Sequence, residues 1–201
     1  MLKIILATHN SHKINEIKSF FNDFNAEIIS MNEIGVYDEI EESGESIEEN
    51  ALIKARWIKE KVDNGIIIAD DTGLFVDYLN GQPGVYSARF AGENATYDDN
   101  NKKLLKLLEG VPFEKRRAYF KTVIALINGN CEHILEGRLD GYIIEKPVGK
   151  NGFGYDPLFY VPEIKKTLAE MKTEEKNKIS HRALALQKLK EYLKINLEGD
   201  R

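Results

Sequence analysis

Apolar residues along this chain follow two spacings, and their alternation predicts an α/β fold. Short continuous apolar runs at 3–7 and 66–69 are typical of buried strands. Apolar residues three and four positions apart predict helices at 14–24 and from 47 to near 64. The first half of the chain therefore alternates strands with helices.

The second half predicts an antiparallel hairpin. Two apolar runs, 118–127 and 133–144, flank Asn128-Gly129-Asn130, a turn sequence. The sheet is therefore expected to be mixed and flanked by helices, in a single domain over 1–201. Further expected features are a capping box of Ser46 and Glu49, an extended piece at 74–76, a helix at 97–109, and a C-terminal helix from Ser180 with Leu186, Leu189, Leu193 and Leu197.

Composition and charge narrow the choice of partners. The chain has 201 residues, 28 Lys and Arg, 33 Asp and Glu, and a formal net charge of −5. No broad positive field attracts nucleic acid, so we expect none as a partner. The single cysteine, Cys131, excludes an internal disulfide, and the N-terminal apolar run is too short for a membrane span. We expect a cytoplasmic protein without membrane attachment.

Two adjacent carboxylates, Asp70 and Asp71, follow the apolar run 66–69 and precede Thr72 and Gly73. In an open α/β sheet the carboxyl end of a strand meets the ligand, and acidic groups there bind hard cations through oxygen. The alternative is a polar turn, since Asp and Gly are ordinary turn residues. This segment alone does not separate the two interpretations.

The loop between the first strand and the first helix has the composition of an anion site. Its residues are Thr8, His9, Asn10, Ser11, His12 and Lys13. Helix N-terminal amides carry partial positive charge, small polar side chains donate to phosphate oxygens, and Lys13 adds a full charge. The alternative is a simple N-cap at Asn10 or Ser11 with a solvated Lys13, and this segment in isolation favours it.

Taken together, these segments resemble the inosine triphosphate pyrophosphatase family, also called Ham1-like or non-canonical purine nucleoside triphosphate pyrophosphatases. The matching segments cover nearly the whole chain and share the family's order and spacing. They are 8–13, 44–46 with 49–51, 69–74, 83–90, 152–157, and Lys176 with 179–182. Thr72 stands where a serine is common in the family.

The resemblance implies a magnesium-dependent hydrolase that converts dITP, ITP and XTP to the monophosphate and pyrophosphate. It also implies an elongated fold with a nucleotide cleft between two lobes, and a homodimer. The matching positions make 8–13 the triphosphate segment and Asp71 the proton acceptor and a metal ligand, with Glu41 as a second magnesium ligand. The implied substrate contacts are Thr72, Phe153, Gly154, Tyr155, Asp156, Lys176, His181 and Arg182.

Hydrolysis of a phosphoanhydride needs a positioned water and positive charge on the phosphate oxygens. We expect Asp71 to orient and deprotonate the water and, with Glu41, to hold Mg²⁺. Adjacent strand residues point opposite ways, so Asp70 should have a different role, as a supporting or structural acid. The same geometry disfavours a haloacid-dehalogenase-type phosphatase. Glu41 lies in an acidic run, 38–49, which is usually a solvated face.

Selectivity for the base is expected to come from donors that meet the six-keto group of hypoxanthine or xanthine, because adenine presents an amino group there. His181 and Arg182 supply such donors, and Phe153 stacks on the base. The alternatives are a core role for Phe153 and a surface helix start at 181–182. Two other functions fit less well: a Maf-like pyrophosphatase acting on pyrimidine or modified nucleotides, and a non-catalytic nucleotide-binding regulator.

Overall fold

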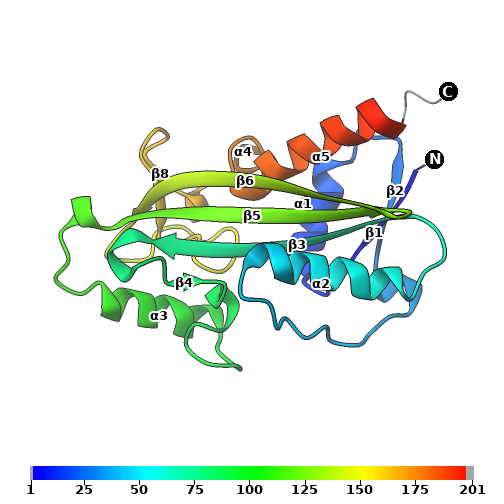
Figure 1. The fold of residues 1–201 in the computed structure, drawn as a ribbon. Coiled ribbons are helices and arrows are strands. Elements are labelled where there is room, and N and C mark those ends of the chain that lie inside the picture. The colour runs from blue at the N-terminus through cyan, green and yellow to red at the C-terminus, as the bar shows by residue number, and fades with distance from the viewer. Residues whose placement is uncertain (1, 198–201) are drawn as a thin grey trace. The chain divides into compact units, whose positions relative to one another are not determined.

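The computed structural model describes residues 2–197, and that range contains eight strands and five α-helices (Figure 1). The strands are β1 (Leu2–Leu6), β2 (Ala26–Ser30), β3 (Ile66–Val76), β4 (Pro83–Gly84), β5 (Arg117–Asn128), β6 (Cys131–Ile143), β7 (Phe159–Val161) and β8 (Lys166–Thr167). The helices are α1 (Ser11–Phe20), α2 (Ile47–Lys59), α3 (Tyr97–Leu107), α4 (Thr173–Lys176) and α5 (His181–Leu197).

The sheet is mixed, as the sequence predicts. Its strand order is β2-β1-β3-β5-β6-β7-β8, and β4 pairs with β3. β1 runs parallel to both β2 and β3, whereas β4, β7 and β8 pair antiparallel with their neighbours. The predicted hairpin is present as β5 and β6, joined at Gly129 and Asn130. The prediction of a mixed sheet flanked by helices is confirmed.

The chain divides into two compact units, and β3, β5 and β6 each run through both. The first unit contains the described residues up to Asp71, Thr122–Gly137, and the described residues from Arg182 onward. The second contains Thr72–Lys121 and Arg138–His181. The single domain over 1–201 stays a prediction.

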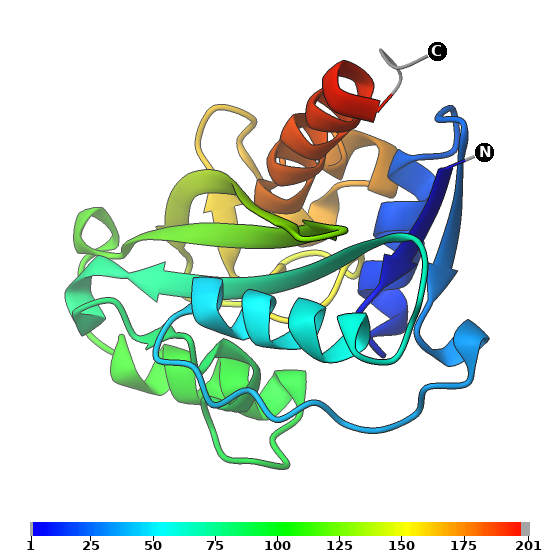
Figure 2. The ribbon, with the colours of Figure 1, turned by 45° about the vertical axis from the view of Figure 1, so that its right-hand side comes forward.

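The core of the first unit follows from the alternation of side chains along β3. Ile66 and Ile68 point toward α1 and α5 and form one apolar cluster with them, while Ile67 and Ala69 are buried on the opposite face. Figure 2 shows α2 on that opposite side of β1 and β3. Asp70 and Asp71 continue the alternation, so each carboxylate enters a different layer.

In the second unit, even-numbered residues of β3 belong to the same apolar cluster as residues of the α3 region. Leu74, Val76 and Phe120 are buried there together with Leu104 and Leu108 of the α3 region. α3 begins with a capping box in which Thr96 and Asp99 bond each other's backbone N–H groups. This cap fixes the first turn of α3.

The structure corrects the prediction that the strand at 66–69 ends at the carboxylates. β3 continues without interruption from Ile66 to Val76. It does so because its neighbour changes: β1 pairs only as far as Ile68, and β4 pairs with Leu74 and Phe75. Gly73 permits this approach, since a Cβ there would lie 2.8 Å from the carbonyl oxygen of Gly84. The carboxylates thus lie where β3 has lost β1 and has not yet met β4.

Helix boundaries also differ from the predictions. α1 begins at Ser11 rather than 14 and ends at Phe20, and α2 ends at Lys59, before the expected 64. α5 begins at His181 with Leu186, Leu189 and Leu193 buried, and the side chain of Leu197 lies outside the described residues. No helix within 2–197 has the length and apolar character needed to cross a bilayer.

Candidate active site

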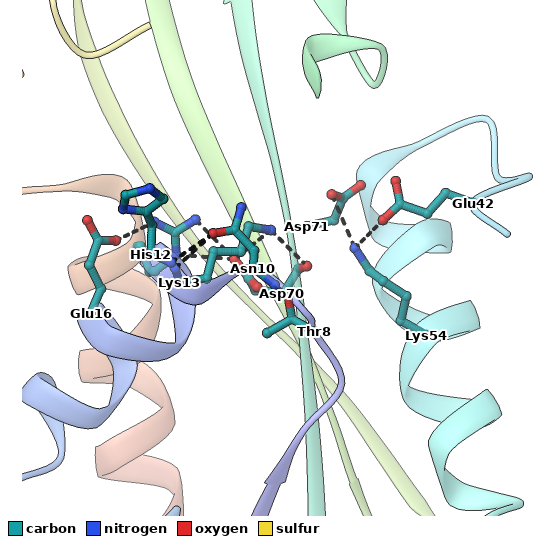
Figure 3. A network of polar contacts seen from close by, with 10 residues as sticks. Thr8, Asn10, His12, Lys13, Glu16, Glu42, Lys54, Asp70 and Asp71 are labelled. Atoms are coloured by element: carbon teal, nitrogen blue, oxygen red, sulfur yellow. Dashed lines mark hydrogen bonds and ion pairs between the residues drawn. The ribbon is translucent and has the colours of Figure 1, made fainter. Parts of the chain in front are cut away.

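Asp70 and Asp71 point to opposite sides of β3 and meet different cations (Figure 3). On the α1 and α5 side, Oδ2 of Asp70 lies 3.1 Å from Nζ of Lys13 and 3.1 Å from Nε and from Nη2 of Arg182. Nη1 of Arg182 donates to Oε2 of Glu16 at 2.5 Å. A single carboxylate oxygen therefore links α1, β3 and α5.

Burial and charge compete at this cluster. Burial acts to raise the pKa of the Asp70 carboxyl, but the charges of Lys13 and Arg182 outweigh it and hold that pKa well below its usual range. Burial lowers the pKa of Lys13, and Asp70 offsets only part of this effect. Asp70 is therefore a carboxylate at neutral pH that pairs with two cations, while its role as a supporting or structural acid stays a prediction.

On the α2 side, Lys54 lies between two carboxylates. Its Nζ is 3.4 Å from Oδ1 of Asp71 and 2.6 Å from Oε1 of Glu42. Burial raises the pKa of Asp71 above that of an ordinary carboxyl, and Lys54 opposes this only in part. Burial acts to lower the pKa of Lys54, but Asp71 and Glu42 outweigh it, and the net shift is upward. A buried carboxylate with a raised pKa has the properties of a general base.

Hydrogen bonds among its own residues fix the loop before α1. Oδ1 of Asn10 accepts from the backbone N–H groups of His12 at 3.0 Å and Lys13 at 3.2 Å, while Oγ1 of Thr8 accepts from the N–H of Asn10 at 3.2 Å. Asn10 is thus the N-cap, but the Lys13 side chain does not extend freely into solvent, because it is only 14% exposed and is paired with Asp70. Two amides expected to face an anion are occupied by the cap.

The other side chains of this loop are more exposed. His9 contacts Oδ1 of Asn32 through Nδ1 at 2.5 Å and the carbonyl oxygen of Asp38 through Nε2 at 2.9 Å. Ser11 and His12 lie exposed at the start of α1. His9 therefore connects this loop to the segment that leads to the acidic run.

A second cluster lies in the second unit, around Phe153 and Asp156. Oδ2 of Asp156 accepts from Nζ of Lys176 at 2.7 Å and from the N–H of Phe153 at 3.0 Å. The Lys176 ammonium also lies 5.0 Å from the centre of the Phe153 ring. A side chain at Gly152, where φ is +74°, would overlap the Asp156 carboxylate, so the turn requires glycine. Phe153, Asp156 and Lys176 are thus brought together as expected.

The remaining predicted contacts of this unit are placed individually. Tyr155 is buried, and its hydroxyl donates to the carbonyl oxygen of Ser87 at 2.8 Å. His181 is buried and stacks on Phe120, with ring centres 4.5 Å apart. Thr72 is half-buried on β3. Tyr155 and His181 therefore carry structural contacts, and their roles as substrate contacts stay predictions.

Glu41 and Glu42 differ in placement. Glu41 is exposed, whereas the neighbouring Glu42 turns inward to Lys54. Sequence reasoning missed both Glu42 and Lys54, although Lys54 carries a signal: it lies in the middle of the apolar stripe formed by Ile47, Ala51 and Ile58. A lysine in such a position needs a buried partner. The metal role of Glu41 stays a prediction.

The donor set on the α2 side fits a divalent cation. Within 2–197 no group of three or more His, Cys, Asp or Glu side chains forms a ready metal site. Mg²⁺, however, is commonly held by one or two carboxylates with substrate phosphates completing its shell. Asp71 and Glu42 already converge on one positive charge, that of Lys54. This pair therefore suits a cation that arrives with a phosphate ligand.

Comparison with known proteins decides the family. The model of the Ham1 family matches residues 4–192. The chain belongs to the Ham1 family. The resemblance stated from the sequence is thereby confirmed.

Relatives and solved structures of the Ham1 family match over nearly the full length. The dITP/XTP pyrophosphatase of Thermoanaerobacter pseudethanolicus is 68% identical over 197 residues, covering 98% of this chain and 99% of that protein. The dITP/XTP pyrophosphatase of Clostridium perfringens is 50% identical over 200 residues, covering 96% and 98%. The structure of the Staphylococcus aureus Ham1 protein has a TM-score of 0.85 at 40% identity, covering 99% and 100%.

Proposed function

We propose that this protein hydrolyses non-canonical purine nucleoside triphosphates, namely dITP, ITP and XTP, to the nucleoside monophosphate and pyrophosphate. Such a reaction removes deaminated purines from the nucleotide pool before they enter DNA or RNA. The observation that carries the proposal is the buried Asp71 carboxylate, whose pKa is raised and which lies beside Lys54. Support also comes from the 68% identical relative, which carries the name dITP/XTP pyrophosphatase.

The proposed chemistry is attack by water on the α-phosphorus of the triphosphate. A P–O bond forms to the water oxygen, the bridging P–O bond breaks, and pyrophosphate leaves with the bonding electron pair. Asp71 accepts the proton from the attacking water. Lys13 and Lys54 place positive charge beside the phosphate oxygens, where negative charge accumulates.

Mg²⁺ is the proposed cofactor, with Asp71 and either Glu41 or Glu42 as its protein ligands. When bound, it neutralises phosphate charge and acidifies a coordinated water. The chain's own contribution is to hold Asp71 and Glu42 close to Lys54, with Asp71 buried and Oε1 of Glu42 at 2.6 Å from the ammonium.

Recognition of the base is assigned to the second cluster. We propose that Phe153 stacks on the purine and that Lys176, fixed by Asp156, contributes a donor. Thr72, Gly154, Tyr155, His181 and Arg182 are the further proposed substrate contacts. Arg182 is already bonded to Asp70 and Glu16. We therefore propose that it also fixes the start of α5 and, through Asp70, the position of Lys13.

The deciding experiment measures pyrophosphate release with Mg²⁺ from ITP, dITP, XTP, GTP, ATP, dUTP and dTTP. The proposal expects fast release from the first three only. Preference for dUTP, dTTP or modified nucleotides would favour a Maf-like enzyme. Binding of ITP without pyrophosphate release would favour a nucleotide-binding regulator. In either case the proposed function is wrong.

We also propose a homodimer that acts in the cytoplasm on free nucleotides. The proposal follows from the family resemblance and from the net charge of −5, which does not favour nucleic acid. Light scattering after size-exclusion chromatography tests the dimer: a mass near 22.9 kDa would mean a monomer.

A further inference from the structure

Asn101 on α3 is bonded to the segment that carries Phe153. Its Nδ2 donates to the carbonyl oxygen of Gly154 at 3.0 Å. One turn earlier on α3, the ring of Tyr97 lies 5.9 Å from the ring of Phe153. Tyr97 and Asn101 are four residues apart and share one face of the helix. This face of α3 therefore supports both Phe153 and the peptide that follows it.

The amide oxygen of Asn101 has an unusual environment. Asn101 is 8% exposed, and its buried Oδ1 has no hydrogen-bond donor within residues 2–197. An unpaired buried acceptor costs stability, and a leucine of similar size would avoid that cost. Packing alone therefore does not explain an asparagine at this position. The contact to Gly154 is the one thing that a leucine could not supply.

Neighbouring Asn100 shows the contrast. Its Oδ1 accepts from the N–H of Ala91 at 2.7 Å, and its Nδ2 donates to the carbonyl oxygen of Ala88 at 3.0 Å. Both ends of that amide are used, and they bond α3 to the backbone of the segment 88–91 that precedes it. Asn100 is thus a structural asparagine of the same helix and of similar burial.

The chemical consequence concerns exocyclic amino groups. Adenine and guanine each carry one, whereas hypoxanthine carries none. An amino group buried in a pocket must find an acceptor, and a backbone carbonyl is a strong one. The bond from Asn101 holds the Gly154 carbonyl toward α3, and the φ of +62° at Gly154 allows this orientation.

We propose that Asn101 is a positioning residue for base selectivity: it turns the Gly154 carbonyl toward α3, so that purines with an exocyclic amino group find no acceptor beside Phe153. The proposal rests on the proposed function, because it assumes that residues 153–156 contact the base. It adds a means of rejecting guanine, which shares the six-keto group with hypoxanthine.

The test compares Asn101→Leu with Asn100→Leu in steady-state kinetics on ITP, GTP and ATP. In Asn101→Leu the freed carbonyl should lower KM for GTP and ATP with little change in kcat for ITP. Relative to the wild-type protein, the ratio of kcat/KM for ITP to kcat/KM for GTP should decrease by a factor of about 2 to about 10. This factor corresponds to the free energy of one neutral hydrogen bond. Asn100→Leu should lower the melting temperature more and leave that ratio unchanged.

Asn101→Asp serves as a second variant, because it keeps the size of the side chain but removes the donor to Gly154. A lower ITP-to-GTP ratio in both Asn101 variants supports the proposal. Equal losses on ITP and GTP, or an unchanged ratio, overturn it by reducing Asn101 to a structural role. Failure of the wild-type protein to hydrolyse ITP is a different result, since it overturns the proposed function itself.

Discussion

Replacing Asp70 with asparagine tests whether one buried carboxylate holds α1, β3 and α5 together. Oδ2 of Asp70 lies 3.1 Å from Lys13 and accepts two hydrogen bonds of 3.1 Å from Arg182. The side chains of Asp70 and Arg182 are each 2% exposed. The substitution keeps the size of the side chain and removes its charge, leaving both cations with a weaker partner.

The size of the effect follows from these contacts. Removing one partner of a buried ion pair typically costs about 3–5 kcal/mol, because the remaining charge is left uncompensated. Arg182 keeps its bond to Glu16, and Lys13 is 14% exposed and so partly hydrated. Both facts favour the lower end of this energy range, so we expect the substitution to lower the free energy of unfolding by about 3 kcal/mol.

The loss should depend on pH with a definite sign. The folded-state pKa of Asp70 is lowered, so its charge stabilises the folded protein fully above the unfolded-state value of about 3.9. The contribution fades as pH falls from there toward the folded-state pKa. The free energies of unfolding of the wild-type and Asp70→Asn proteins should therefore differ by a constant amount between about pH 5 and pH 8. This difference should decrease below about pH 4.

Urea unfolding followed by circular dichroism, in buffer with EDTA, measures both effects. Asp77→Asn is the matched control, because that side chain is 55% exposed and lies 4.0 Å from Arg117. It should change stability by less than about 0.5 kcal/mol. An Asp70→Asn loss as small as that of the control would refute the reasoning, as would a loss that persists undiminished at the lowest pH.

Three further substitutions test other parts of the structure. Asp71→Asn should lower kcat for ITP by about 10²- to 10⁴-fold while the melting curve shows a folded protein; a folded variant with normal turnover would remove Asp71 as the base. Lys54→Met leaves Asp71 and Glu42 without their shared cation, so MgCl₂ should raise its melting temperature more than that of the wild type; equal shifts in thermal-shift assays would contradict the proposed cation site. Gly73→Ala drives a Cβ against the carbonyl of Gly84 and should cost about 1–3 kcal/mol in urea unfolding, and an unchanged midpoint would mean that β3 and β4 separate freely.

The placement of Asp70 and Asp71 on opposite faces of β3 could be predicted because strand geometry is local. Alternation sends adjacent side chains to opposite faces, and the structure places Asp70 against Lys13 and Asp71 against Lys54. The course of β3 could not be predicted in the same way. Whether a strand ends at its first polar residues depends on which strands pair beside it, and here the pairing strand β4 comes later in the chain, with Gly84 opposite Leu74.

The pairing of Lys54 with Glu42 was likewise beyond the sequence pattern. The acidic run 38–49 has many carboxylates, and nothing in their order says which one turns inward. The position of Lys54 in the apolar stripe of α2 shows that some acid must meet it. Only the packing of the segment before α2 makes Glu42 that acid and leaves Glu41 exposed.

The charges of the first-unit cluster bear on how a triphosphate would bind there. Lys13, Lys54 and Arg182 face Asp70, Asp71, Glu16 and Glu42, so three cations meet four carboxylates. Each cation is already paired, and the cluster has no surplus positive charge for a polyanion. On the proposed function, a triphosphate therefore needs a divalent cation to enter with it, since only an added charge can turn the Asp71 side from repulsive to attractive. The ion pairs that fix the side chains of this cluster are therefore one more argument for Mg²⁺ as the proposed cofactor.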